Sequence, residues 1–143
     1  MPLVRWPAVL LTALCLVPLS CSSKSGLNPV QGKVLYQNQP LGGALVSFHS
    51  DGPADIHVEP TVGFTKEDGT FQLTTGKEDG APAGHYTVTI MCSEIPKTPQ
   101  KGFSTGGVES VDRLKGAYAN LGTSKLKVEI KPGSNQLEPF DLK

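Results

Sequence analysis

The chain has 143 residues and no formal net charge; 38% of its residues are hydrophobic and 18% are charged, with 16 glycines and 12 prolines. This length predicts one small domain. The glycines have no period of three and apolar runs recur throughout, which excludes a collagen-like or wholly disordered chain. No apolar stretch reaches the roughly 18 residues of a spanning helix, and no basic excess exists to hold a phosphate backbone. A polytopic membrane protein or a nucleic-acid-binding protein is therefore not expected.

The first 20 residues differ in composition from the rest of the chain. Arg5 supplies one positive charge, and residues 6–19 are apolar apart from Thr12. A basic residue followed by an apolar core of about 14 residues is typical of a secretory signal peptide, and such a core is too short to span a bilayer. We therefore predict a signal peptide over residues 1–20 and export of the remaining chain.

Ser20 directly before Cys21 resembles the lipobox of bacterial lipoproteins, in which the signal is cut ahead of a cysteine that then carries the lipid. The lipobox favours leucine three residues before the cysteine, where this chain has Pro18, so ordinary cleavage a residue or two later stays open. Lipidation would anchor the protein by acyl chains alone, each buried CH₂ contributing about 0.8 kcal/mol. The expected location is the cell envelope, as a membrane-anchored lipoprotein of the outer membrane or the periplasmic face.

Cysteine use and composition separate the anchor from the folded domain. Cys15 leaves with the signal and Cys21 is assigned to lipid, so Cys92 has no partner and no internal disulfide is expected. Residues 21–28 are small and polar and predict a flexible tether. The folded domain is expected over residues 29–143.

From Pro29 onward, apolar and polar residues alternate with a period of two, which is typical of half-buried strands. The alternation forms seven short runs. Asp68-Gly69 between two of them predicts a hairpin, and residues 132–135 predict a turn into the last run, where Pro139 accounts for a slip in phase by a bulge or an edge position. The apolar members of the runs are Val30, Val34, Tyr36, Ala44, Val46, Phe48, Val62, Phe64, Phe71, Leu73, Tyr86, Val88, Ile90, Cys92, Leu126, Val128, Ile130, Phe140 and Leu142.

Seven short strands with frequent turn signals predict an all-β fold, a seven-stranded antiparallel β-sandwich of the immunoglobulin-like or prealbumin-like kind. One long loop, residues 93–122, interrupts this plan, and loops of that length are usually functional or disordered. Within it, Val108, Val111 and Leu114 recur at a spacing of three. That spacing is as compatible with a short helix over residues 108–114 as with an irregular loop.

Several motifs resemble the carboxypeptidase regulatory-like domain, a transthyretin-like family found alone in short bacterial lipoproteins. Residues 30–34 follow its V-x-G-x-V pattern, residues 40–44 its P-L-x-G-A step, and residues 63–75 its T-D-x-D-G-x-F-x-L hairpin. Together with residues 79–88, the likeness extends over nearly all of the exported chain. It implies a seven-stranded prealbumin-like sandwich, accessory rather than catalytic, on a cell envelope. Where the family often has Asp before the hairpin turn, this chain has Lys66-Glu67, which weakens a metal-binding interpretation of that turn.

The patterns that could hold a metal are weak. Lys-Glu-Asp-Gly occurs at residues 66–69 and 77–80, but five extended residues separate the two turns by roughly 17 Å. Each turn alone offers two carboxylates, whereas calcium takes six to eight oxygens. His49, His57 and His85 lie too far apart in sequence for the close histidine pair of an iron dioxygenase. No metal site and no cofactor are expected.

Nucleophilic catalysis finds no support either. Cys92 is in phase with Val88 and Ile90, which indicates a buried thiol rather than an activated nucleophile. Transthyretin-like hydrolases of purine breakdown end in Tyr-Arg-Gly-Ser, whereas this chain ends in Asp-Leu-Lys and keeps only Arg113 after export. An enzyme is therefore not expected.

The sequence thus predicts a non-catalytic, lipid-anchored envelope module for binding, spacing or structural support. The alternative is an envelope carbohydrate-binding sandwich, weakened by the loss of Trp6 with the signal; a hydrolase or metalloenzyme of the same fold ranks third. Expected partners are the membrane, through the lipid, and envelope proteins or polysaccharide. Binding residues tend to lie on loops of a rigid scaffold, and the candidate binding residues of the long loop are Lys97, Lys101, Arg113 and Lys115.

Overall fold

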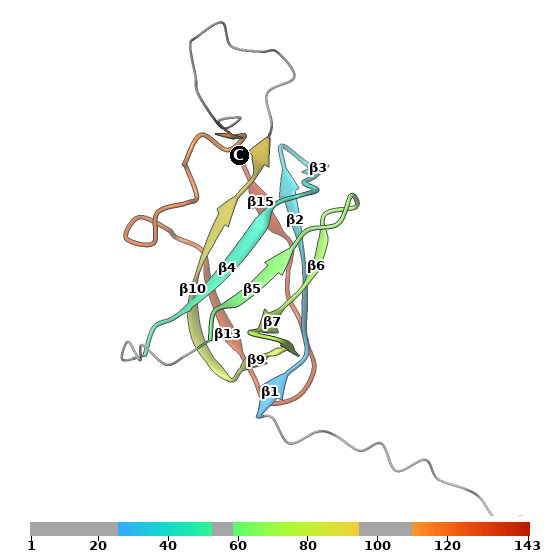
Figure 1. The fold of residues 1–143 in the computed structure, drawn as a ribbon, viewed down its shortest axis with the longest axis vertical. Coiled ribbons are helices and arrows are strands. Elements are labelled where there is room, and N and C mark those ends of the chain that lie inside the picture. Colours follow the sequence, from blue (N-terminus) through green and yellow to red (C-terminus); the bar gives the residue numbers. More distant parts are fainter. Residues whose placement is uncertain (1–25, 53–58, 95–109) are drawn as a thin grey trace, which may run out of the picture.

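The computed structural model describes residues 26–52, 59–94 and 110–143 (Figure 1). Within these ranges the chain forms strands and turns without a helix, so the all-β prediction is confirmed. Each of the seven predicted strands has a counterpart, in β2, β4, β5, β6, β10, β13 and β15. The strands are β1 (Leu27–Asn28), β2 (Val30–Tyr36), β3 (Gln39–Pro40), β4 (Leu45–Ser50), β5 (Thr61–Phe64), β6 (Thr70–Gln72), β7 (Thr74–Thr75), β8 (Glu78–Asp79), β9 (Ala81–Pro82), β10 (Gly84–Met91), β11 (Ser93–Glu94), β12 (Val111–Asp112), β13 (Lys127–Ile130), β14 (Asn135–Gln136) and β15 (Phe140–Leu142).

The strands build a β-sandwich of two main layers (Figure 1). One layer is a six-stranded sheet in the order β13-β10-β4-β5-β7-β8, antiparallel throughout. The other layer is centred on β2, which pairs antiparallel with β3 and β6 but parallel with β14 and β15. The antiparallel prediction therefore holds for the first layer, while the second layer is mixed.

The parallel pairs arise because residues 131–134 cross between the layers instead of closing a hairpin. Asn135 holds this turn: its Oδ1 accepts the Lys131 N–H at 2.9 Å and its Nδ2 donates to the Lys131 carbonyl at 2.8 Å. The backbone N–H of Asn135 then donates to Pro29 at 2.8 Å, which starts the alignment with β2. Of the predicted last strand, residues 137–142, only Phe140–Leu142 forms a strand, and it begins directly after Pro139, which has no N–H to give to a ladder.

Phe71 and Leu73 explain a second crossing between the layers. β6 pairs with β2, whereas β7 pairs with β5, and Leu73 between them is 1% exposed. The Asp68-Gly69 turn forms as predicted, with Gly69 at φ +77° and its N–H bonded to Lys66 at 2.8 Å. The strands on its two sides nevertheless enter different layers, so the predicted hairpin is wrong as a strand pair. Burying both apolar side chains requires the strand to turn the corner of the sandwich.

The core is one apolar cluster between the two layers. Phe71 stacks on Phe140 with ring centroids 6.2 Å apart, and Phe48 lies 6.4 Å from the first and 6.5 Å from the second. Aromatic rings at these separations attract one another, which adds to the stabilisation from burying their surface. The buried hydrophobic residues are Val30, Val34, Leu41, Ala44, Val46, Phe48, Phe71, Leu73, Ala81, Tyr86, Val88, Ile90, Cys92, Leu114, Ile130, Phe140 and Leu142.

Strand β5 departs from the expected pattern because its glycine, not its apolar residues, faces the core. A Cβ on Gly63 would lie 2.7 Å from the Gln72 carbonyl oxygen and 3.0 Å from the Phe71 ring. The neighbouring positions Val62 and Phe64 therefore point outward, and Phe64 is 67% exposed. Close approach of two backbones at a glycine outweighs the apolar pattern of the strand here.

The motif residues at the start of the domain pack against one another. A Cβ on Gly32 would lie 2.5 Å from the Phe71 ring, so only glycine leaves room for that side chain. Leu41 is fully buried and donates its N–H to Val34 at 3.0 Å. Ala44 is also fully buried, and its N–H donates to the Thr65 hydroxyl at 2.8 Å. These residues join β2 to the strands that follow it.

The folded domain begins earlier than the sequence predicted. Leu27 and Asn28 form β1 opposite Pro82 and Ala81 of β9, and the Asn28 side chain donates to the Ala81 carbonyl at 3.2 Å. The predicted tether over residues 21–28 is therefore wrong at its last two residues. This segment has few apolar residues, and hydrogen bonds of the Asn28 side chain hold it in place instead. The signal peptide over residues 1–20 and the rest of the tether up to residue 25 lie outside the described residues.

Candidate functional site

The predicted binding loop, residues 93–122, stands on a short strand ladder. Ser93 and Glu94 of β11 pair with Asp112 and Val111 of β12, and the Arg113 N–H donates to the Cys92 carbonyl at 2.7 Å. Residues 95–109 lie outside the described residues. Residues 93–94 and 111–112 are thus held together directly after β10, and the candidate site is narrowed to this stem.

Of the two alternatives left open for residues 108–114, the described residues 110–114 show the non-helical one. Val111 belongs to β12 and is 51% exposed, while Arg113 to Ala119 form turns. Leu114 is 4% exposed and packs in the core, as its apolar character predicted. A helix is displaced because the Asp112 side chain takes the backbone donors that a helix would pair within itself.

Asp112 organises the turn that follows β12. Its Oδ1 accepts backbone N–H bonds from Cys92 and Leu114, both at 3.0 Å, and its Oδ2 accepts one from Gly116 at 2.7 Å. Partial burial raises the pKa of this carboxyl, but the three backbone bonds outweigh it and hold the pKa below its usual value of 3.8. The ionised carboxylate is therefore a structural acceptor rather than a free acid.

The structure places two of the four predicted binding residues at the stem. Arg113 Nη1 lies 3.8 Å from Glu94 Oε1 in an exposed ion pair, and Lys115 lies on the exposed turn at φ +53°. The Glu94 and Asp112 carboxylates balance the charges of Arg113 and Lys115, so the described stem has no net charge. Lys97 and Lys101 lie outside the described residues.

Cys92 lies at the base of the stem, and its thiol is inaccessible to solvent. It is 2% exposed, and its Sγ lies 3.8 Å from the Gly42 carbonyl oxygen, to which the thiol donates. Burial raises the pKa of the Cys92 thiol above its usual 9.0. The predicted buried, unreactive thiol agrees with this environment.

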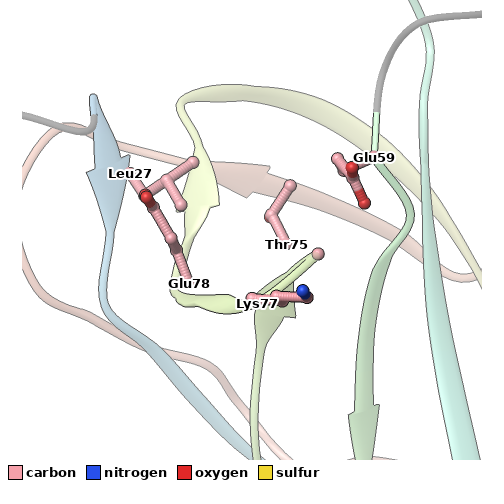
Figure 2. A pocket seen from close by; sticks show the side chains of 6 residues that line it. Leu27, Glu59, Thr75, Lys77 and Glu78 are labelled. Carbon is pink, nitrogen blue, oxygen red and sulfur yellow. The ribbon is translucent and has the colours of Figure 1, made fainter.

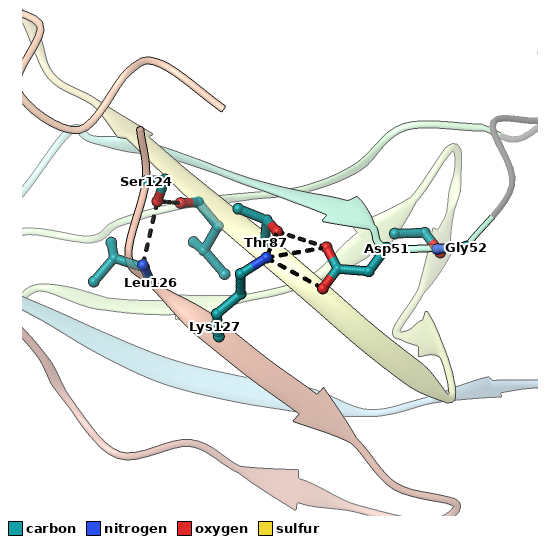
Figure 3. A network of polar contacts seen from close by, with 8 residues as sticks. Asp51, Gly52, Thr87, Ser124, Leu126 and Lys127 are labelled. Atoms are coloured by element: carbon teal, nitrogen blue, oxygen red, sulfur yellow. Dashed lines mark hydrogen bonds and ion pairs between the residues drawn. The ribbon is translucent and has the colours of Figure 1, made fainter. Parts of the chain in front are cut away.

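A polar network covers the outer face of β10 (Figure 3). The Thr87 hydroxyl donates to Asp51 Oδ1 at 2.5 Å and accepts a bond from the Lys127 ammonium, which also lies 3.3 Å from Asp51 Oδ2. The hydrogen bond from Thr87, together with Lys127, holds the pKa of Asp51 below 3.8 against the desolvation that raises it. This arrangement ties the end of β4 to β10 and β13 and leaves Thr87 4% exposed.

An open pocket of about 500 Å³ lies beside the second Lys-Glu-Asp-Gly turn (Figure 2). Its lining side chains include Glu59, Lys77 and Glu78, all exposed, with Leu27 of β1 on one side. Charges of both signs at a solvated mouth provide no selective binding surface. Among residues 26–52, 59–94 and 110–143, no three His, Cys, Asp or Glu side chains are grouped so as to hold a metal ion.

Three other polar side chains considered as candidates, those of Asp68, His49 and Tyr86, have structural partners. Asp68 accepts both the N–H and the hydroxyl of Thr70, at 2.9 and 2.6 Å, which closes the first Lys-Glu-Asp-Gly turn. His49 Nε2 lies 2.9 Å from the Thr89 hydroxyl. The Tyr86 hydroxyl donates to the Pro82 carbonyl at 2.9 Å. His57 lies outside the described residues.

The described residues do not include a row of exposed aromatic side chains. Their exposed large hydrophobic side chains are Phe64, Met91, Val111 and Leu121, of which only Phe64 is aromatic. Sugars stack on rows of aromatic rings, and one isolated ring does not provide such a row. The described part of the chain likewise contains no helix long and apolar enough to cross a bilayer.

Comparisons with known proteins leave the family open. No protein-family model and no curated protein matches the chain. A DUF3823 family protein from Parabacteroides merdae is similar with a TM-score of 0.39 and 19% identity, over 78% of this chain and 43% of that one. A 9R-lipoxygenase from Cyanothece is similar with a TM-score of 0.40 and 13% identity, over 82% of this chain and 16% of that one. The chain thus spans less than half of either protein, and at these TM-scores neither likeness supports an inference about function.

Proposed function

We propose that the chain is a lipid-anchored module of the bacterial cell envelope, held by Cys21, which binds or spaces other envelope components without catalysing a reaction. The observation that carries this proposal is the position of β1, where Leu27 pairs with Pro82. Only residues 22–26 then separate Cys21 from the first strand, which is at most about 20 Å of extended chain. A lipid on Cys21 would hold the β1 end of the sandwich against the membrane.

The opposite end of the sandwich is the end that would meet a partner. β10 runs from the end near β1 to the end that carries the C-terminus, and the loop stem follows it there (Figure 1). The Tyr118 hydroxyl, 3.2 Å from the Lys143 carbonyl oxygen, ties the segment after the stem to this same end. Arg113 and Lys115 would therefore face away from the membrane, toward envelope proteins or polysaccharide.

We also propose that the chain belongs to the carboxypeptidase regulatory-like family. It is supported by the packing of the motif residues, since Gly32 makes room for Phe71 and Gly69 approaches the Val34 carbonyl, where a Cβ would lie 2.5 Å from the oxygen. In such a family the motif would preserve the sandwich rather than a catalytic site. The same argument favours an accessory role over a hydrolase or metalloenzyme.

The proposal is tested by Cys21→Ala in the full chain, with membrane and soluble fractions compared. Loss of the acyl chains removes the proposed anchor, so the variant is expected in the soluble fraction. Cys92→Ala is the matched control, because it removes a buried thiol and should leave the protein in the membrane fraction. Membrane retention of Cys21→Ala would contradict lipid anchoring.

Partner binding at the far end needs its own experiment. Replacing residues 96–108 by a short Gly-Ser linker keeps β11, β12 and the Asp112 turn, and capture from envelope extracts is compared with Arg113→Ala and Lys115→Ala. We expect reduced capture in at least one of these variants at unchanged unfolding free energy. Unchanged capture in all of them would remove the loop end as the binding site.

A further inference from the structure

One edge of the sandwich is open and apolar. β13 is the end strand of the six-stranded sheet, paired with β10 on one side only among the described residues. Beside its free edge lies a groove of about 360 Å³. Leu126, Val128 and Leu137 line this groove half-buried, with Phe140 at its floor. An unpaired strand edge over an apolar groove is a template for another strand.

The backbone of β13 decides which of its groups face that edge. The Val88 N–H donates to the Leu126 carbonyl at 2.9 Å, so Leu126 and, two residues on, Val128 direct their backbone groups toward β10. Lys127 and Glu129 therefore direct their N–H and C=O groups away from β10, to the free edge. A strand added there must place its own outward groups opposite these two residues.

We infer that a second copy of this chain occupies the edge, with β13 pairing antiparallel to the partner's β13 about a two-fold axis at Val128. In this register Lys127 faces Glu129 of the partner subunit, and Glu129 faces the partner's Lys127. Residues that face each other then carry opposite charges in both pairs and exchange backbone hydrogen bonds. Val128 meets the partner's Val128 over the groove, where both are removed from water.

Neighbouring registers of the same parity are poorer. Moving the axis to Lys127 or to Glu129 puts two like charges opposite each other at the centre. Pairing does not extend past Glu129, because the Lys131 N–H is already bonded to the Asn135 side chain at 2.9 Å. The contact is therefore short and two-fold symmetric, typical of a weak isologous dimer.

Lys127 remains able to take part in both interactions. Its side chain is 60% exposed while its ammonium contacts Asp51 and Thr87 on the outer face of the sheet. Glu129 is exposed beside it on the same face, opposite His85 of β10. The charged pairs of the dimer would thus continue the polar network of Figure 3 across the two copies.

Cysteine cross-linking of the full chain, isolated in mild detergent, tests the register. In a non-hydrogen-bonded antiparallel pair the two Cα atoms lie about 4.5 Å apart, within reach of a disulfide. Val128→Cys is therefore expected to give a disulfide-linked dimer under mild oxidation. Glu129→Cys is the matched control, since two copies of residue 129 would lie roughly 8 Å apart in this register and cannot be bridged. The wild-type chain shows any linkage through its native cysteines.

Charge exchange in the Val128→Cys background tests the partner's identity. Glu129→Lys sets like charges opposite each other in both pairs and should lower the dimer yield about tenfold. Adding Lys127→Glu restores opposite charges and should recover the yield, with circular dichroism verifying the fold of each variant. The inference would be overturned if Val128→Cys gave no dimer or if Glu129→Cys gave as much dimer as Val128→Cys. It would also be overturned if the dimer yield did not change with the charge exchange. Cross-linking to a different protein instead of a second copy would overturn it as well.

Discussion

Gly32→Ala tests the packing of the sandwich at its tightest point. The added Cβ would lie 2.5 Å from Phe71 Cζ and 2.7 Å from Cε1, whereas carbon atoms pack at about 3.5 Å or more, so the ring must move by about 1 Å. Phe71 is 1% exposed and packs against both Phe48 and Phe140, with little room to move. Overpacking of this kind costs up to about 3 kcal/mol.

The net effect is smaller because alanine loses less backbone entropy than glycine in a strand. That difference returns about 0.5–1 kcal/mol, which leaves a net loss of about 2 kcal/mol in the unfolding free energy. Urea unfolding followed by circular dichroism measures it, with Gly52→Ala as the control, where the nearest heavy atom lies at 3.4 Å. Equal stabilities of the two variants would refute the packing of Gly32 against Phe71.

Four further results follow from individual side chains. Val88→Ala should lower the unfolding free energy by about 1–3 kcal/mol, and Thr87→Ala by about 1 kcal/mol, because its buried hydroxyl joins two charged groups; a negligible loss for Thr87→Ala in urea unfolding would contradict the network. Folding lowers the pKa of Asp112, so its carboxylate contributes to the unfolding free energy above about pH 4, and this contribution is lost as the pH falls through the folded pKa. Asp112→Asn should therefore flatten the acid limb of a plot of unfolding free energy against pH. An unchanged acid limb would contradict this role. Cys92 should react with a thiol reagent only after unfolding, with Cys92→Ala as the blank, and fast labelling of the folded chain would contradict its burial.

Alternation predicted the strands well because several of them, such as β2 and β4, bury one face. In β10, Tyr86, Val88 and Ile90 lie in the core as their spacing requires. The same rule placed Thr87 at the surface, yet it is buried, because a residue distant in sequence, Asp51, bonds it there. Local periodicity carries no information about such a partner.

Strand pairing was the part that local pattern could not provide. The turn at Gly69 was predictable from Asp-Gly, but the entry of β5 and β6 into different layers depends on where Phe71 and Leu73 find the core. At the loop stem, Asp112 has a sequence signal that was missed: an Asp side chain can accept the backbone N–H two residues further on and so form a turn. The bond from the Leu114 N–H to Asp112 Oδ1 is that turn.

The free edge of β13 shows the same division. The tripeptide Lys127-Val128-Glu129 can be read from the sequence. Whether it can pair with a second strand depends on which backbone groups face the free edge, and only the bond between Val88 and Leu126 shows this. The candidate residues Arg113 and Lys115 were selected by loop length and charge, and the structure adds the Glu94 carboxylate that offsets one of them.

Lipid anchoring at Cys21 is tested by the intact mass of the exported chain. We expect a mass equal to residues 21–143 plus the thioether-linked lipid and acyl chains. A chain that starts at Ser23 or later and carries no acyl mass would contradict it.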